Sequence, residues 1–472
     1  MGEGRGVMRP QIRRTVWVLA VAGSLIAGCT GTDGASTATT GSTSTGSSTG
    51  RPATPGSSTA VVASGSGESS GSAVTGSPTG SAAEPAAGVV KESLTPVVGA
   101  VTTLPVPVRT TDGKVTLAYE LSLVNVPSVP VTITTVKVID VTSGTVLQEY
   151  SGDALLAHFK ATGNAPGGAA PTAAVLTGGQ HGFVWLNPAV PDGSPVPSKL
   201  RHELTLSYGT APNPLIPAQS TETIAPTAVR KDSAPVISSP LRGPNWFDAN
   251  GCCDEVTPHR GSANPVNGEF YFAERFAIDW VQLDEEKRLY TGDQTKVESY
   301  PYYGAEVHAV ADGVVVATLD GQPTQTPGAS PAAGALTIDQ YGGNYVVEQF
   351  DQDGETYYAF FAHLQPGSVD GHVKVGQQVR AGDVVGLLGN TGNTDAPHLH
   401  FHVMNSPNPL ASDGLPYEFE EFSLVGQAAS DDAIGTLFSG APLPLSSPGV
   451  TGPRTKEMPS YLDLLDFPAS GS

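Results

Sequence analysis

The stretch "APHLHFHVM", residues 396–404, carries a histidine at every second position. Side chains on a β-strand alternate between its two faces, so His398, His400 and His402 are predicted to share one face, opposite the apolar residues between them. Neighbouring positions on one face lie about 6.6 Å apart, close enough for two imidazoles to serve one metal ion or one reacting group. The stretch therefore predicts an active site, a metal site, or a polar face that is only rich in histidine.

The composition of the whole chain limits what these histidines can belong to. Its 472 residues predict two or three domains. The formal net charge is −21, and Lys and Arg form no run beyond the first residues. Such a chain is not expected to bind nucleic acid.

The first 28 residues are predicted to be a secretory signal. Four arginines precede a short apolar run, residues 16–22, and small residues follow as far as Cys29. The run is too short for an ordinary membrane span, so we expect export and removal of residues 1–28. The ending "IAGC" is similar to a bacterial lipobox, which implies an acylated Cys29 that anchors the protein in the bacterial membrane, facing the cell wall. The alternative is an ordinary signal peptide in which Cys29 has no role.

Composition and periodicity divide the rest of the chain. Residues 29–88 are mostly Ser, Thr, Gly and Ala, so they cannot bury a core and are expected to be a disordered tether. Alternation typical of strands then begins, as in "KVTLAYELSLV", residues 114–124. The predicted fold class is all-β, with an immunoglobulin-like sandwich followed by a second β domain that contains the histidine stretch. The expected boundaries are 1–28 signal peptide, 29–88 tether, 89–229 sandwich, 230–255 linker, 256–425 second domain and 426–472 Gly/Pro-rich tail. Within the tail, "YLDLLDF" is expected to add an edge strand.

Four motifs follow one another between Gly304 and Met404. They are "VHAVADGVVV" from Val307, "FAHL" from Phe361, "VKVGQQVRAGDVVGLLGNTGNT" from Val373 and "HLHF" from His398. Together they resemble the antiparallel β-core of the lysostaphin-type (LytM-like) zinc metallopeptidases. The resemblance implies an endopeptidase that uses one zinc ion per chain to hydrolyse peptide bonds of peptidoglycan.

The resemblance also implies roles for individual residues. The family binds zinc through the His and the Asp of an H-x-x-x-D motif and through the second His of H-x-H. Carried over to this sequence, Asp279 and His400 become metal ligands, while His363 and His398 become catalytic. The H-x-x-x-D motif falls on "RFAID", residues 275–279, where Arg275 stands in place of the first ligand.

Arg275 cannot act as that ligand, because a guanidinium has no lone pair to offer. At about 4 Å from a divalent cation, with an effective dielectric of about 20, its charge would cost about 8 kcal/mol in repulsion. Either Arg275 turns away from the metal and another residue completes the site, or zinc is bound weakly or not at all. We favour His259, because its segment leads directly into the Asp279 strand. The alternatives are His402, Cys252, Cys253, or two protein ligands with a water and a His398 contact.

Two hypotheses about function follow. The first is a membrane-anchored zinc endopeptidase that remodels the cell wall, and it is favoured because His363 and His398 are both present. The second is a degenerate domain in which Arg275 pairs with Asp279 in place of the metal. Such a domain would bind wall peptide or regulate a partner wall hydrolase.

The adjacent cysteines of "NGCCDE" have three readings in an oxidising compartment. Cys252 and Cys253 could form a vicinal disulfide, pair between chains, or bind metal. A local disulfide that fixes a turn is the interpretation we favour.

Overall fold

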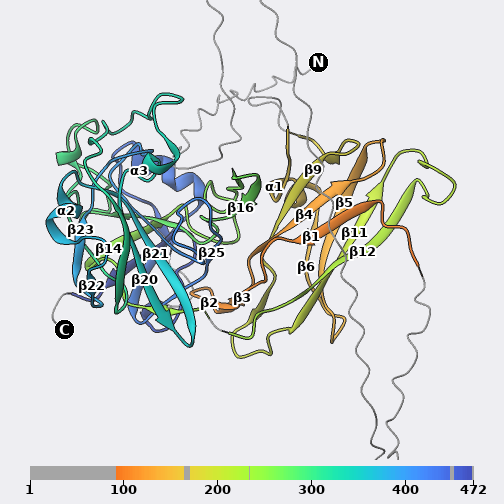
Figure 1. Ribbon diagram of the computed structural model, residues 1–472, viewed down its shortest axis with the longest axis horizontal. Helices are drawn as coiled ribbons and strands as arrows, with labels where there is room; N and C mark the ends of the chain where they lie inside the picture. Colours follow the sequence, from red (N-terminus) through yellow and green to blue (C-terminus); the bar gives the residue numbers. More distant parts are fainter. Residues whose placement is uncertain (1–91, 164–170, 233, 447–450, 470–472) are drawn as a thin grey trace, which may run out of the picture. The chain divides into compact units, whose positions relative to one another are not determined.

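The computed structural model describes residues 92–163, 171–232, 234–446 and 451–469. Strands make up most of their secondary structure, so the predicted all-β class is confirmed (Figure 1). The described residues from Leu94 onward belong to one compact unit. The predicted signal peptide, Cys29 and the predicted tether lie outside the described residues. Among the residues that the structure does describe, no helix has both the length and the apolar character needed to cross a membrane.

Two antiparallel sheets form a sandwich near the start of the described chain (Figure 1). The first has the order β1-β4-β9-β7, and the second has the order β12-β11-β5-β6, with β8 paired to β5. Alternate side chains such as Leu121, Leu123, Leu204 and Leu206 fill the core between the sheets. The strands are β1 (Val97–Val101), β4 (Tyr119–Asn125), β5 (Val131–Asp140), β6 (Val146–Ser151), β7 (Phe159–Ala161), β8 (Ala174–Leu176), β9 (His181–Leu186), β11 (Lys199–Ser207) and β12 (Gln219–Ala228).

A 12-stranded sheet organises the rest of the chain. Its order is β22-β19-β20-β21-β24-β17-β14-β30-β27-β28, with β25 on β24 and β29 on β27. The strands are β14 (Gly243–Ala249), β17 (Ile278–Gln282), β19 (Gly313–Leu319), β20 (Asn344–Gln352), β21 (Glu355–Leu364), β22 (Gln378–Val379), β24 (Leu399–Met404), β25 (Gly414–Leu415), β27 (Phe422–Ala428), β28 (Leu445–Ser446), β29 (Gly452–Arg454) and β30 (Asp463–Phe467).

Shorter elements complete the fold. The small sheets contain β2 (Val108–Thr110), β3 (Lys114–Thr116) and β10 (Ala189–Pro191), β13 (Val236–Ile237) and β26 (Glu418–Phe419), β15 (Asn264–Val266) and β16 (Glu269–Tyr271), and β18 (Glu306–His308) and β23 (Val384–Leu387). The helices are α1 (Gly152–Ala157), α2 (Ser368–His372) and α3 (Ile434–Phe438), with short 3-10 turns η1 (Val297–Ser299), η2 (Ile338–Gln340) and η3 (Asp431–Ala433).

The histidine stretch is strand β24, which lies between β17 and β21. Its register places His400 opposite Asp279 on one side and opposite Ala362 on the other. The apolar residues that alternate with the histidines, including Phe401, belong to the main hydrophobic core. The predicted division of this strand into a histidine face and an apolar face is therefore confirmed.

Two segments have more structure than their composition indicated. Residues 230–255, expected to be a linker, contain β13 and β14, and β14 lies inside the large sheet between β17 and β30. The strand expected in the tail is present as β30, but its expected position at an edge is wrong, because β30 pairs with β14 on one side and β27 on the other. Both strands carry only short apolar runs among Pro, Gly and Ser, so neither run is long enough to show a period.

Because β30 is an interior strand, we expect the end of the chain to contribute directly to stability. Leu465 is fully buried, whereas Leu445 on β28 is 39% exposed. Leu465→Ala should lower the free energy of unfolding by about 2–5 kcal/mol, as for other buried leucines. The matched control Leu445→Ala should change it by less than about 1 kcal/mol. Urea denaturation compares the two, and equal small effects would show that β30 is dispensable.

Candidate metal centre and cavity

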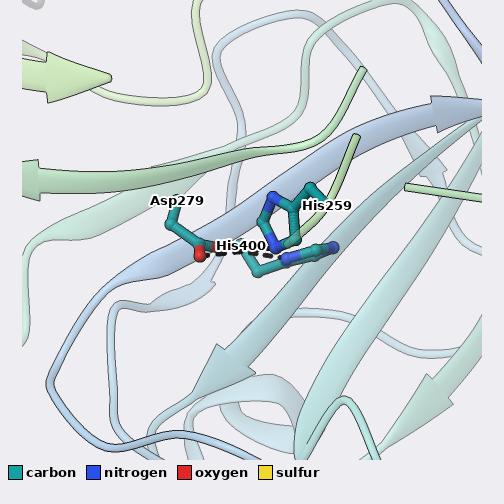
Figure 2. Close-up of side chains that lie close together, drawn as sticks. All are labelled: His259, Asp279 and His400. Carbon is teal, nitrogen blue, oxygen red and sulfur yellow. Dashed lines mark hydrogen bonds and ion pairs between the residues drawn. The ribbon is translucent and has the colours of Figure 1, made fainter. Parts of the chain in front are cut away.

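Asp279 lies at the centre of a buried group of histidines. Its carboxylate oxygens are 3.3 Å from His259 Nε2, 3.3 Å from His398 Nε2 and 3.1 Å from His400 Nδ1. All four side chains are at most 3% exposed. One carboxylate oxygen and one ring nitrogen each from His259 and His400 lie within 4.8 Å of one another, which is close enough to hold one metal ion (Figure 2).

A loop after β14 brings His259 to this position. Asn250, at the start of the loop, donates from Nδ2 to Asp279 Oδ2 at 3.1 Å. Thr257 donates from Oγ1 to the Asn250 carbonyl at 3.1 Å, and the Arg260 amide donates to the same Thr257 oxygen at 3.2 Å. These bonds fold the loop back on itself, so that His259 faces a strand whose sequence begins almost twenty residues later.

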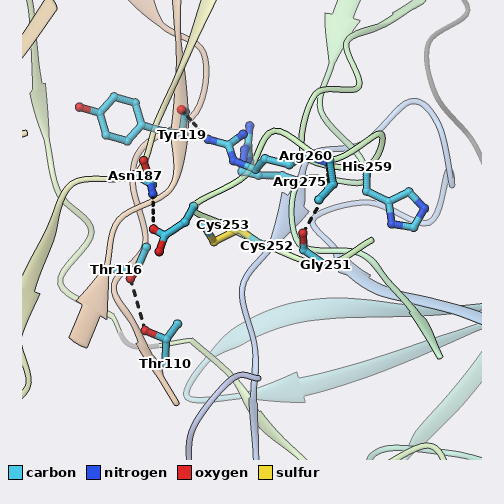
Figure 3. The surroundings of a disulfide bond; sticks show 12 residues. Thr110, Thr116, Tyr119, Asn187, Gly251, Cys252, Cys253, His259, Arg260 and Arg275 are labelled. Carbon is cyan, nitrogen blue, oxygen red and sulfur yellow. Dashed lines mark hydrogen bonds between the residues drawn. A yellow bond between two sulfur atoms is a disulfide. The ribbon is translucent and has the colours of Figure 1, made fainter. Parts of the chain in front are cut away.

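The same loop carries a disulfide between Cys252 and Cys253 (Figure 3). This agrees with the favoured interpretation of these cysteines as a local bridge. Because both sulfurs are used in the bridge, neither offers the thiolate that zinc requires. The alternative in which a cysteine completes the metal site is therefore wrong for this structure.

Backbone carbonyls fix the ring orientation of three histidines. Nδ1 of His259, His363 and His398 lies 3.2, 2.7 and 2.8 Å from the carbonyl oxygens of Ala277, Thr391 and Ala396, in that order. Each Nδ1 must carry the proton to make this bond, so the neutral ring keeps a lone pair on Nε2.

The lone pair of His259 is the feature that fits a metal. Burial lowers the pKa of His259 to about 4, and the opposing effect of Asp279 does not offset it, so the ring is neutral at pH 7. Its Nε2 then faces a carboxylate oxygen with no proton between them, and it has no hydrogen-bond partner within the described part of the chain. Two electron-rich atoms in this arrangement are stabilised by a cation. Imidazole nitrogens and a carboxylate are ligands that zinc accepts.

His363 and His398 lie beside this group and differ in their electrostatics. Their ring centroids are 4.6 Å apart. Burial lowers the pKa of His363 well below its usual value, and the neighbouring His398 and His400 lower it further. Burial would also lower the pKa of His398, but the Asp279 charge reverses the effect and raises it. Pairs whose pKa values are pushed apart in this way are suited to acid and base roles.

His363 also has an unusual backbone conformation. Its φ of 63° lies in the left-handed region, which a residue with a Cβ adopts at a cost of about 1 kcal/mol or more. It follows Ala362, the last residue of β21 that pairs with β24. With the backbone in this conformation, the His363 ring contacts the rings of His398 and His400.

His402, considered above as an alternative metal ligand, does not lie next to Asp279. Its Nδ1 lies 2.9 Å from His400 Nε2, on the side of the His400 ring that faces away from Asp279. It therefore contacts the histidine that faces Asp279 and does not itself reach the carboxylate. A partner on the second ring nitrogen is typical of metal-bound histidines, because it fixes the orientation of the ring.

Arg275 points away from the group. Its guanidinium binds Glu120 of β4, with Nε 2.9 Å from Oε1 and Nη2 2.6 Å from Oε2. Nη1 donates to the Gly414 carbonyl at 2.8 Å. No ion pair joins Arg275 to Asp279 among the described residues, so the predicted pairing of Arg275 with Asp279 is wrong.

A cavity of about 300 Å³ opens beside the histidines. Its wall is formed by the β15–β16 turn, the segment around η2 and the loop that follows β24. The residues that line it are Val266, Asn267, Glu274, Ile338, Asp339, Tyr341, Gly342, Tyr345, Phe360, His363, His400, His402, Asn408, Pro409, Leu410 and Ala411.

Glu274 is a site residue that the sequence did not reveal. It is 3% exposed and lines the cavity with His363 and His400. Burial raises the pKa of Glu274 well above its usual value, and Asp279 raises it further. The raised pKa favours the protonated carboxyl, whose O–H can donate a hydrogen bond to an acceptor group of a bound peptide. Its position next to Arg275, in the segment that leads to Asp279, is the only sequence signal that pointed to it.

Comparisons with known proteins agree with the resemblance. Residues 297–412 match the protein family described as Peptidase family M23. Glycyl-glycine endopeptidase ALE-1 of Staphylococcus capitis is 30% identical over 128 residues, which cover 27% of this chain and 29% of that protein. Peptidoglycan DD-endopeptidase ShyA of Vibrio cholerae is 35% identical over 107 residues, which cover 23% of this chain and 19% of that protein.

A solved structure, the catalytic domain of the antimicrobial peptidase lysostaphin from Staphylococcus simulans, covers 33% of this chain and 86% of that chain at 22% identity, with a TM-score of 0.19. The chain thus spans under a third of the length of the first two relatives. The matched family region begins after Asp279, so the structure, and not the match, brings His259 and Asp279 to the site.

We expect zinc near one per chain in the purified protein, and we expect its loss in His259→Ala, Asp279→Ala and His400→Ala. Each change removes one of three candidate ligands, and a two-ligand site binds zinc weakly. Elemental analysis after purification without chelator gives the measurement. His372→Ala, which removes an exposed histidine of α2, is the matched control and should keep its zinc. Full zinc content in His259→Ala would exclude His259 as a ligand.

Proposed function

We propose that the M23 peptidase domain of this chain is a zinc endopeptidase that hydrolyses peptide bonds of bacterial peptidoglycan. The observation that carries the proposal is the buried group of His259, Asp279 and His400, in which a neutral His259 directs its lone pair at a carboxylate. The named activities of ALE-1 and ShyA support peptidoglycan as the substrate class.

His259, Asp279 and His400 would hold the metal, with Asn250 and His402 supporting two of them from behind. Two nitrogens and one carboxylate oxygen leave one position open, as in other catalytic zinc sites. A bound zinc ion would polarise the scissile carbonyl and lower the pKa of a coordinated water. Its third ligand would come from His259 and not from position 275.

The two remaining histidines would move protons. The Thr391 carbonyl holds the Nδ1 proton of His363, so its Nε2 is free to accept a proton from the attacking water. His398, whose pKa the Asp279 charge raises, is the better proton donor and would protonate the leaving amine. The walls of the cavity, with Glu274 among them, would orient the peptide and exclude water.

The location of the protein forms part of the proposal. Export through residues 1–28 and acylation of Cys29 would anchor the chain in the membrane, and the 29–88 tether would let the enzyme reach the wall. The relatives named for peptidoglycan endopeptidase activity fit a place in the cell envelope.

His398→Ala and His363→Ala should each lower the rate of peptide release from purified peptidoglycan by about 10² to 10⁴-fold, the usual contribution of a general acid or base. Both variants should keep their zinc, which separates loss of proton transfer from loss of metal. His372→Ala again serves as control. Digestion by His398→Ala at the wild-type rate would contradict the assignment. Peptide binding without cleavage by the zinc-loaded wild type would favour the degenerate, regulatory role.

A further inference from the structure

Glu120 of β4 is a fully buried carboxylate that two arginines share. Arg275 binds it through Nε and Nη2, and Arg260 binds it through Nη1. Arg260 is 1% exposed and Arg275 is 3% exposed. Both guanidiniums belong to the segment between β14 and β17, whereas Glu120 belongs to the sandwich.

Arg260 makes two hydrogen bonds in addition to its ion pair with Glu120. Its Nη2 donates to the carbonyl of Tyr119 (Figure 3) and to the carbonyl of Leu186, each at 3.0 Å. These carbonyls lie on β4 and at the end of β9, so the backbone of the first sandwich sheet fixes the guanidinium. Arg260 is also the residue directly after His259, and adjacent Cα atoms are about 3.8 Å apart.

His259 needs this support more than the other candidate ligands. Asp279 lies on β17, which is paired on both sides, and His400 lies on β24, which is also paired on both sides. His259 lies in a loop that forms no strand, between β14 and β15. The loop keeps its own bonds through Thr257 and Asn250, and Arg260 adds a bond to a separate sheet.

We infer that the sandwich positions the metal ligand His259 through Glu120 and Arg260, so that metal binding by the peptidase domain depends on a residue of the sandwich. This inference rests on the proposed metal centre. Glu120 and Arg260 are positioning residues, because neither reaches the candidate metal position. The competing explanation is that the cluster only holds two parts of the fold together, as buried ion pairs elsewhere do.

Two variants separate these explanations. Arg260→Met and Arg275→Met each remove one buried guanidinium and leave Glu120 paired with the other, so they are matched in charge and volume. Arg260→Met should weaken cobalt and zinc binding by the full chain at least about tenfold, the usual cost of losing a supporting contact behind a ligand. Arg275→Met should stay within about threefold of wild type, because Asp279 is fixed by its strand pairing.

The visible spectrum of the cobalt-loaded protein provides a second readout. A change in ligand geometry alters the absorption of bound cobalt, whereas a lower stability alone reduces only the folded fraction. We expect an altered spectrum in Arg260→Met and a wild-type spectrum in Arg275→Met. A double-mutant cycle completes the test: His259→Ala should weaken metal binding much less in the Arg260→Met background than in the wild type.

Each result of these metal-binding experiments either supports or overturns the inference that the sandwich positions His259. Wild-type affinity and spectrum in Arg260→Met, or additive effects in the cycle, would overturn it while leaving the metal centre in place. A wild-type protein that binds neither cobalt nor zinc would overturn both the metal centre and the inference. Should Arg260→Met yield no folded protein, Arg260→Lys keeps the charge but cannot reach Glu120 and both carbonyls together. Weakened metal binding by the folded Arg260→Lys would support the inference, and unchanged binding would overturn it.

Discussion

The pairing of one buried carboxylate, Glu120, with two buried guanidiniums is the constraint on which the rest of the site depends. Burial alone would raise the pKa of Glu120, but Arg275 and Arg260 hold it below its usual value, so the carboxylate is ionised. The carboxylate cannot pair with one arginine while leaving the other unpaired, because an uncompensated buried charge costs several kcal/mol. The cluster therefore ties the segment between β14 and β17 to the sandwich at two points, Arg260 and Arg275.

The candidate metal centre also places one buried carboxylate among nitrogen-bearing side chains, which here are histidines. Asp279 is the single anion among them, and the charge of His398 and the hydrogen bond from His400 hold its pKa well below the usual range despite burial. Backbone carbonyls hold the outward nitrogens of His259, His363 and His398, so each ring has one direction left in which to act. Strand pairing fixes Asp279 and His400, and loop contacts fix His259. The protein's own contacts thus define the geometry of the group, and preorganised polar groups of this kind stabilise charge efficiently.

The sequence predicted the parts of this arrangement that follow from local periodicity. The two faces of β24 and the strands of the sandwich come from alternation, and the grouping of His400 with Asp279 comes from the motifs of the resemblance. It could not place the contacts that join distant segments: Glu120 is separated from Arg275 by 155 residues, and no local pattern links them. The strand identity of β14 and the interior position of β30 were missed for a related reason. A short apolar run has no period, so only pairing within the sheet shows that it is a strand and where in the sheet it lies.

Arg275 illustrates how a departure from a motif should be interpreted. Taken alone, a guanidinium at that position conflicts with a divalent cation, since its charge cannot be removed at a working pH. This repulsion arises only if the Arg275 guanidinium lies near the metal. Glu120, Thr103 and the Gly414 carbonyl bind the guanidinium on the side away from Asp279. The same Glu120 anchors the residue next to His259, which occupies the side of Asp279 that the arginine leaves open. In the proposed metal centre, the ligand absent from position 275 and its replacement His259 would both depend on one carboxylate, so an arginine at position 275 does not by itself argue against a metal.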